Sequence, residues 1–367
     1  MPFRPNLARL LLVLIALVPT VRACWRRPTP PPPKTTVEPA PKTTEGDVST
    51  APPGTTGEPR TRAPPIPPSP SETLLAVGGF TRKIEKTVFT YNTTSEDLGN
   101  FQYALRLPRT GVRAAVHGST VFVVGGETLP VGLSADVYYG DDKGFVEAPK
   151  PLSPFQQATA SAVIGDQFVL CGGLQRLPGP PYFKVTNRCD AYSFAEKKWS
   201  TETVPDLPYK VIRATAVAID DALYVIGGAD KAGTPKKKVL KLDTKGDNKW
   251  KEVAPLSIVR SGASATVYPL LSGGSGILVC GGDSGGEEFE SSCELYDPDS
   301  GDWTPFAAMT KRRFEFSLLS CRNVLVAIGF AKEIDRYNER LEKWEESIFA
   351  DMPDGLVDFG AVCYSGE

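Results

Sequence analysis

Gly-Gly pairs recur along the chain at nearly even intervals, and each pair follows a short apolar run. The runs are LLAV, VFVV, FVLC, LYVI and ILVC, and a degenerate sixth copy has Gly329-Phe330 after VLVAI. The first glycines are Gly78, Gly125, Gly172, Gly227, Gly281 and Gly329, at successive spacings of 47, 47, 55, 54 and 48 residues. A short, wholly apolar run predicts a buried β-strand, and the glycines that follow it suit a close backbone approach with positive φ.

A second signal recurs with the first. Tyrosine is followed by tryptophan seven residues later in Tyr192–Trp199, Tyr296–Trp303 and Tyr337–Trp344. Looser copies are Tyr138–Phe145, Leu242–Trp250 and Tyr91–Phe101. Each repeat is therefore expected to run as an inner strand, a Gly-Gly strand, a Tyr strand and a Trp strand. A period of about 50 residues with four strands is typical of a β-propeller blade, so the sequence predicts an all-β, six-bladed propeller.

The ends of the repeat region predict how the ring closes. The region opens on a Gly-Gly strand, residues 73–79, with no inner strand before it. It ends on an alternating segment, Asp358–Ser365, after the last tryptophan. We expect this segment to be the missing inner strand of the first blade, so that closure leaves no open sheet edge.

These repeats resemble the kelch-repeat family, in which an apolar strand, Gly-Gly, a Tyr-Asp-like step such as Tyr296-Asp297 and then Trp follow in order. The resemblance covers residues 73–367. In kelch substrate adaptors the arginine of an Arg-x-Gly-Val step lies at the mouth of the central channel and grips acidic ligands. The resemblance implies such a ligand-binding role for arginines near the inner-strand starts: Arg109 and Arg260 by motif, Arg313 by position, and Arg213 two positions further on. Gln156 and Val211 replace the arginine in two other copies, so the expected ring is incomplete.

The first 72 residues read as two further segments. Residues 1–23 have Arg4 and Arg9, an apolar core and a terminal Ala23, which predicts a secretory signal peptide. Residues 24–72 are rich in Pro and Thr, with 15 of the 34 prolines between 28 and 70, and predict a disordered linker or stalk, O-glycosylated or unmodified. A secreted, extracellular protein is expected. The alternative is a periplasmic or lipid-anchored protein, because Val21-Arg22-Ala23-Cys24 faintly resembles a lipoprotein cleavage site, although Arg22 fits it badly.

Cysteines recur at matched positions. Cys171 and Cys280 each precede a Gly-Gly pair, and Cys189 and Cys293 each stand three residues before the tyrosine of the same blade. Neighbouring antiparallel strands bring such positions within disulfide range, so a secreted chain predicts the bridges Cys171–Cys189 and Cys280–Cys293; reduced core cysteines are the alternative. Cys321 and Cys363 fall near the ends of neighbouring inner strands and either pair or stay reduced. Cys24 is left without an intramolecular partner.

Several chemistries are excluded. His117 is the only histidine, so a Cys/His zinc cluster and a histidine-ligated copper site lack their ligands, and no metal or other cofactor is expected. No phosphate-binding or dinucleotide-binding glycine motif is present. A net charge of −2 argues against nucleic-acid binding, and no apolar run of about 18 residues or more predicts a membrane span in the mature chain.

Three functions remain. The preferred one is a non-catalytic extracellular module that binds a protein or glycan ligand through the loops of one face, with no catalytic residue assigned. The second is an enzyme that resembles the kelch sialic-acid mutarotases, with Glu315 beside Arg313, or Asp358, as the acid–base candidates. The third is a structural role in an extracellular matrix, through the stalk and Cys24. Asn92-Thr93-Thr94 is the one usable glycosylation sequon.

Overall fold

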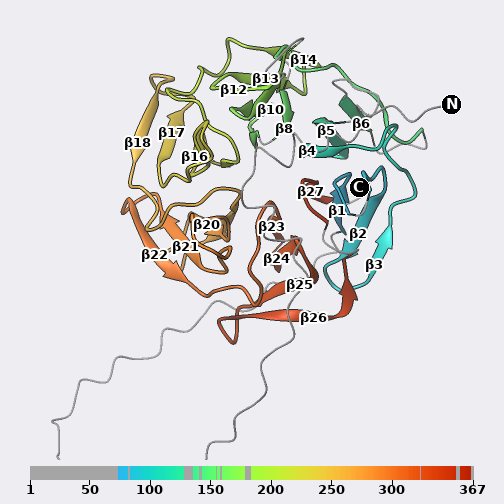
Figure 1. Cartoon of the computed structure of the whole chain (residues 1–367), viewed down its shortest axis with the longest axis vertical. Coiled ribbons are helices and arrows are strands. Elements are labelled where there is room, and N and C mark those ends of the chain that lie inside the picture. The colour runs from blue at the N-terminus through green and yellow to red at the C-terminus, as the bar shows by residue number, and fades with distance from the viewer. Residues whose placement is uncertain are drawn as a thin grey trace, which may run out of the picture. The chain divides into compact units, whose positions relative to one another are not determined.

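The computed structural model describes residues 73–81, 83–127, 135–139, 143–153, 155–157, 159–177, 183–322, 324–352 and 356–364. The predicted signal peptide and stalk lie outside these residues. Every regular element within them is a strand, and six four-stranded antiparallel sheets form the blades of a propeller (Figure 1). The prediction of an all-β, six-bladed propeller is confirmed.

The first three blades, each given from the inner to the outer strand, take up the N-terminal half of the ring. Blade 1 consists of β27 (Gly360–Tyr364), β1 (Thr73–Val77), β2 (Val88–Asn92) and β3 (Leu98–Asn100). Blade 2 consists of β4 (Thr110–His117), β5 (Thr120–Glu127), β6 (Ala135–Tyr138) and β7 (Val146–Glu147). Blade 3 consists of β9 (Ala160–Ile164), β10 (Gln167–Cys171), β13 (Cys189–Ser193) and β14 (Lys198–Ser200).

The other three blades keep the same order. Blade 4 consists of β15 (Thr215–Ile219), β16 (Ala222–Ile226), β17 (Val239–Asp243) and β18 (Trp250–Val253). Blade 5 consists of β19 (Ser264–Pro269), β20 (Ser275–Cys280), β21 (Cys293–Asp297) and β22 (Asp302–Phe306). Blade 6 consists of β23 (Ser317–Cys321), β24 (Val324–Gly329), β25 (Ala331–Asn338) and β26 (Lys343–Asp351).

Beside the six blades lies a separate three-stranded sheet, built from the segment before β9 and from the connection between β10 and β13. Its strands are β8 (Phe155–Gln157), β11 (Leu174–Arg176) and β12 (Phe183–Val185), with β11 in the middle. In the part of the chain that the structure describes, no helix is long and apolar enough to cross a membrane.

The ring closes as predicted. β1 pairs antiparallel with both β2 and β27, in a register that sets Thr73 opposite Tyr364, and Figure 1 shows red β27 beside blue β1. The Cys321–Cys363 bond joins β23 of blade 6 to β27 of blade 1. Further from the channel, Glu96 in the β2–β3 turn accepts hydrogen bonds from Arg336 Nη1 of β25 and Ser347 Oγ of β26, both at 2.7 Å. Blades 6 and 1 are therefore held together at their inner and outer strands.

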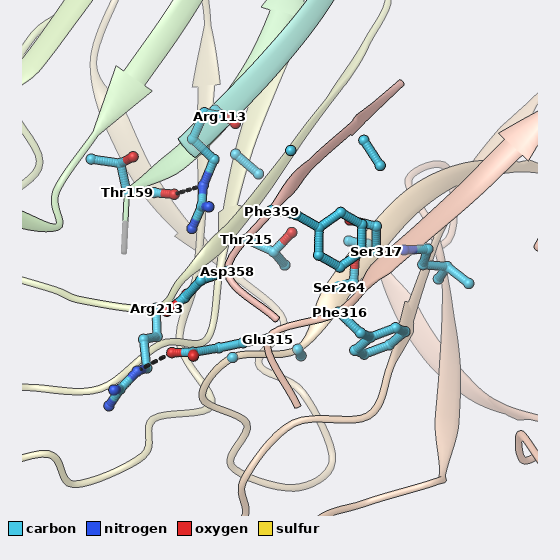
Figure 2. A pocket seen from close by; sticks show the side chains of 18 of the residues that line it. Arg113, Thr159, Arg213, Thr215, Ser264, Glu315, Phe316, Ser317, Asp358 and Phe359 are labelled. Carbon is cyan, nitrogen blue, oxygen red and sulfur yellow. Dashed lines mark hydrogen bonds and ion pairs between the residues drawn. The ribbon is translucent and has the colours of Figure 1, made fainter. Parts of the chain in front are cut away.

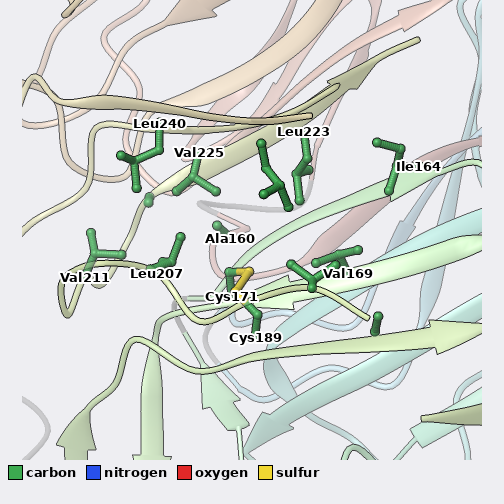
Figure 3. Close-up of a cluster of buried hydrophobic side chains, with 14 residues drawn as sticks. Ala160, Ile164, Val169, Cys171, Cys189, Leu207, Val211, Leu223, Val225 and Leu240 are labelled. Carbon is green, nitrogen blue, oxygen red and sulfur yellow. A yellow bond between two sulfur atoms is a disulfide. The ribbon is translucent and has the colours of Figure 1, made fainter. Parts of the chain in front are cut away.

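The core lies between the blades. Each of six buried apolar clusters spans two neighbouring blades, and Figure 3 shows the one between blades 3 and 4, around Val169, Leu223 and Val225. Because a blade packs on both faces, its second strand is apolar at successive positions rather than alternately. The Gly-Gly pairs lie where blades approach: a Cβ on Gly227, whose φ is 63°, would stand 2.5 Å from the Arg260 carbonyl oxygen of the next blade.

The tryptophans of the repeat tie each blade to the one before it. The indole N–H of Trp303 donates to the Ala254 carbonyl at 2.9 Å, and this carbonyl directly follows the outer strand of blade 4. The equivalent bonds join Trp199 to Pro149, Trp250 to Pro205 and Trp344 to Ala307. A large apolar ring with one polar atom suits this position, because the ring is buried between blades while its N–H finds an acceptor.

Candidate functional site

A cavity of about 230 Å³ opens in the central channel, at the end where the inner strands begin (Figure 2). Residues from all six blades line it, and most of the wall is small or carries a hydroxyl group. The small and hydroxyl-bearing wall residues include Ala114, Thr159, Ser161, Thr215, Ala216, Ser264, Ala265, Ser317 and Ala361. Four charged side chains, Arg113, Arg213, Glu315 and Asp358, also line it. We call these four residues the channel cluster.

Three members of the cluster occupy one position of the repeat. In the second and fifth blades a glycine follows the arginine before the inner strand by two residues: Gly111 follows Arg109, and Gly262 follows Arg260. Arg213, Glu315 and Asp358 stand at that position in the fourth, sixth and first blades. All five have positive φ, between 50° and 76°, so this position is left-handed whichever residue fills it.

Backbone hydrogen bonds between neighbouring blades fix that conformation. The N–H of Gly262 donates to the Arg213 carbonyl at 2.9 Å, and the N–H of Glu315 donates to the Gly262 carbonyl at 2.9 Å. The N–H of Gly111 donates to the Asp358 carbonyl in the same way, at 2.5 Å. A side chain in the left-handed region is strained by about 1–3 kcal/mol, and such strain clusters at functional sites. Here it is present at three charged residues around one cavity.

The cluster combines two arginines with two acids. Arg213 Nε donates to a Glu315 carboxylate oxygen in a tight ion pair, and both side chains stay partly accessible, at 20% and 17%. Burial opposes the charge on Arg213, but Glu315 and Asp358 outweigh it and raise the arginine's pKa. The Arg213 guanidinium also lies 5.5 Å from the Phe314 ring centre, a cation–π contact.

Arg113 enters the cavity from β4. Its Nε donates to the Thr159 carbonyl at 2.7 Å and its Nη1 to the Val112 carbonyl at 2.8 Å, so two backbone oxygens hold the guanidinium in place. Burial lowers the pKa of Arg113, against the effect of Asp358 and Glu315. Arg113 was not among the predicted site residues, because it follows Arg109 by four positions and no other copy of the repeat has a charge there.

Asp358 lies between the two arginines in Figure 2. Its carboxyl group is within hydrogen-bonding reach of the Glu315 carboxyl group. Burial and the adjacent Glu315 raise the pKa of Asp358 to about 7, although Arg113 and Arg213 act in the opposite direction. Asp358 is thus the carboxyl group in this cavity that changes charge near neutral pH.

The structure corrects the expected placement of the other arginines. Arg109, Arg260 and Arg313 do not line the cavity, and their exposed fractions are 0%, 2% and 0%. Each guanidinium turns into its own blade, where Nη1 donates to the carbonyl of the first glycine of the Gly-Gly pair, as Arg260 does to Gly281 at 2.8 Å. Of the four predicted arginines only Arg213 lies at the cavity, and Glu315 pairs with Arg213 rather than with Arg313.

Each inward arginine is neutralised by an acid two residues before the blade's tyrosine. The pairs are Arg109–Asp136, Arg260–Glu294 and Arg313–Asp335. Blade 4 has Val211 and Leu240 at the two positions, both in the apolar core. Blade 3 keeps the acid, Asp190, whose pKa burial raises and which accepts hydrogen bonds from Ser153 N and Oγ at 2.6 and 2.7 Å. A buried charge needs such partners, which explains why the arginines turn inward.

The structure contains both predicted bonds, Cys171–Cys189 and Cys280–Cys293. It also contains Cys321–Cys363, the pair that the sequence left open. Such bonds fit an oxidising, extracellular environment. Cys24 lies outside the described residues. Asn92 ends β2, and its side-chain oxygen accepts from Thr94 N at 2.8 Å and Ser95 N at 3.0 Å; its glycosylation stays a prediction. Within the described ranges no group of three or more His, Cys, Asp or Glu side chains is arranged to hold a metal ion.

Comparisons with known proteins agree with this architecture. The Kelch motif family model matches residues 212–257 and 270–310. Kelch-like protein 40 from Mus musculus is 36% identical over 165 residues, which cover 40% of this chain and 25% of that protein. Kelch-like protein 40 from Xenopus tropicalis is 27% identical over 282 residues, which cover 70% of this chain and 43% of that protein. The chain therefore spans less than half of the length of these relatives.

A solved structure, "Structure of YjhT", superposes with a TM-score of 0.58 at 17% identity and covers 77% of this chain and 99% of that one. At that identity the likeness concerns the fold. The motif matches, the kelch-like relatives and the six closed blades lead to one conclusion: the chain belongs to the kelch-repeat β-propeller family.

Proposed function

We propose that this protein is an extracellular binding module, and that its propeller holds a protein or glycan ligand at the mouth of the central channel through the channel cluster. One observation carries the proposal. Arg213, Glu315 and Asp358 replace glycine at a left-handed position in three separate blades, and their side chains meet in one cavity. Folding alone would favour glycine at each of these positions. The strain is explained if the three charges serve a ligand.

The chemistry of the cluster suits a polar ligand. Guanidinium groups bind carboxylates and other oxygen-rich groups with paired hydrogen bonds, and the wall hydroxyls supply further donors and acceptors. The loops on this face fit less well as the main site. A basic loop after β16 carries Lys236-Lys237-Lys238, and its Lys236 pairs with Asp230 at 2.7 Å. An acidic loop after β20 carries Glu287, Glu288 and Glu290, and its Glu288 pairs with Arg312 at 2.8 Å. Secretion is part of the proposal and is supported by the three disulfides.

The test is a comparison of bound molecules rather than a single capture. The purified protein and its Arg213→Gln and Lys236→Ala variants are incubated with a pool of secreted proteins and with a glycan array. We expect partners that the wild type and Lys236→Ala retain in equal amounts and that Arg213→Gln loses. Partners retained equally by all three proteins would place binding away from the channel cluster.

A second function is favoured by one specific observation. A carboxylic acid with a pKa of about 7, such as Asp358, is matched to proton transfer at neutral pH, and Glu315 and two arginines lie beside it. This arrangement is suited to an acid–base enzyme of the sialic-acid mutarotase kind. The check is the rate of anomer interconversion of N-acetylneuraminic acid, followed by NMR. The enzyme role requires acceleration by the wild type that Asp358→Asn abolishes and that Asp299→Asn, at an exposed turn, preserves.

A further inference from the structure

The two carboxyl groups of the channel cluster are too close to be ionised independently. Glu315 is fixed by the Nε of Arg213, and the Asp358 carboxyl group is its hydrogen-bonding neighbour. Two carboxyl groups that line one cavity and repel each other raise the pKa of one of them, so one proton is retained more readily than on an isolated carboxyl group. Each carboxyl group enters from a different blade, so the closed ring holds the pair together.

The charge of the cavity therefore depends on one proton. With the proton bound, two guanidinium groups face a single carboxylate and the cluster carries a net positive charge. Without it, the four charges cancel. Asp283, on the loop after β20, also acts on Arg213 through its charge. Including Asp283 lowers the net charge of the cavity by one, both with and without the proton, so the difference between the two states stays the same.

The protonated cluster has hydrogen-bond donors that are not used within the cluster. The Arg213 Nη groups and the Arg113 Nη2 make no hydrogen bond within the described residues, whereas the Nε of each arginine is already used. Ser161 and Thr215 line the same cavity. Free guanidinium edges in a confined, partly desolvated space are the preferred partners of a carboxylate.

We propose that the channel cluster binds a carboxylate group of its ligand together with a proton, so that binding strengthens as the pH falls through neutrality. The inference rests on the binding role proposed above and gives that site a ligand chemistry and a control. A carboxylate beside Asp358 favours the protonated form of that residue, and by thermodynamic reciprocity the protonated form binds the carboxylate more tightly. The charges that face Asp358 in this cavity are those of Glu315, Arg113 and Arg213.

The direct test uses acetate as the probe and the full-length protein. Calorimetric titrations at pH 5.5, 7 and 8.5, in pairs of buffers with different ionisation enthalpies, give the affinity and the number of protons taken up. We expect binding at pH 5.5 to be at least about tenfold tighter than at pH 8.5, as for charges interacting across a partly buried site. We also expect uptake of a fraction of a proton per acetate at pH 7. Equal affinity at all three pH values, or no proton uptake, would overturn the proposal.

Variants assign the effect to the cluster. Asp358→Asn keeps the site without its titrating charge, so acetate should bind at pH 8.5 about as tightly as it binds the wild type at pH 5.5, with no proton uptake. Arg213→Gln should bind weakly at every pH. Asp299→Asn, at an exposed turn, is the matched control and should behave as the wild type. A pH dependence that persists in Asp358→Asn contradicts the proposal.

A second arm identifies the source of the carboxylate. An N-acetylated, C-amidated triglutamate peptide should bind more than tenfold tighter than acetate if the carboxylate belongs to an acidic chain segment of a partner, and comparably to acetate if it belongs to a small molecule. Both results support a proton-coupled carboxylate site. The two proposals also fail separately: partners insensitive to Arg213→Gln remove the binding role, while acetate tests the proton coupling by itself.

Discussion

The Arg260 guanidinium and the Glu294 carboxylate meet inside blade 5, with Nε and Oε1 2.8 Å apart and both side chains nearly inaccessible, at 2% and 3%. Removing one partner leaves the other charge buried and alone, which typically costs about 3–5 kcal/mol. We expect Arg260→Val to lower the free energy of unfolding by that amount in urea titrations. A rim arginine that bound a ligand would give almost no change, because exposed charges contribute little to stability.

Blade 4 supplies the matched control, since it carries Val211 and Leu240 at the equivalent positions. The double variant Arg260→Val/Glu294→Leu copies that apolar pair, and replacing a buried ion pair with apolar side chains is often close to neutral. We therefore expect the double variant to recover most of the stability that the single variant loses. If the double variant is as unstable as the single one, the ion pair has a role that packing cannot replace.

The contrast between these arginines and Arg213 shows what the sequence could predict. The repeat spacing was enough for the blades and their closure, because apolar runs, Gly-Gly and Tyr–Trp steps are local patterns. The direction of the Arg109 side chain was not local: it depends on an acid 27 residues later, on another strand of the same blade. The partner acids are visible in the sequence, and their regular place two residues before the tyrosine is the signal that predicts the inward direction of the arginines.

The channel cluster was harder to predict. Arg213 and Glu315 are 102 residues apart and meet only because six blades close into a ring. The available signal was the replacement of a recurrent glycine by Arg213, Glu315 and Asp358 in three copies. That replacement alone does not reveal which side chains converge, since convergence depends on the geometry of the channel.

The terminal strand β27 should be required for a stable ring. Deleting Gly360–Glu367 removes the inner strand of blade 1, exposes the edge of β1 and takes away the partner of Cys321. We expect loss of cooperative thermal unfolding and aggregation, since an open strand edge pairs with other chains. Deletion of residues 365–367 alone, which leaves β27 intact, is the control. An unchanged melting temperature for the longer deletion would show that the ring does not depend on this closure.

The three disulfides should be detectable, and they should differ in how much each stabilises the folded protein. Peptide mapping without reduction is expected to find Cys171–Cys189, Cys280–Cys293 and Cys321–Cys363. The loops that they close have sequence separations of 18, 13 and 42 residues. A chain-entropy model gives about 3 kcal/mol for the shorter loops and about 4 kcal/mol for the longest. Replacing Cys321 and Cys363 by serine should therefore lower the melting temperature most; free thiols in the native protein would contradict the pairing.

Asp358 should give the stability of the propeller a measurable dependence on pH. Its pKa is about 7 in the folded protein, against an ordinary value of 3.8. Because the folded state keeps this proton over a range in which the unfolded chain has lost it, the contribution of Asp358 to the free energy of unfolding falls as the pH rises from about 4 to about 7, and is constant above that. Asp358→Asn removes this contribution, so the variant should gain stability relative to the wild type across that range.

Glu315→Gln should reduce the effect, because it removes the neighbouring charge that helps to raise the pKa of Asp358. The measurement is urea unfolding of the three proteins between pH 4 and pH 8.5, compared as differences so that other titrating groups cancel. A wild type that gains stability over Asp358→Asn as the pH rises would mean that the folded protein favours the ionised form, and that the two arginines outweigh burial and Glu315.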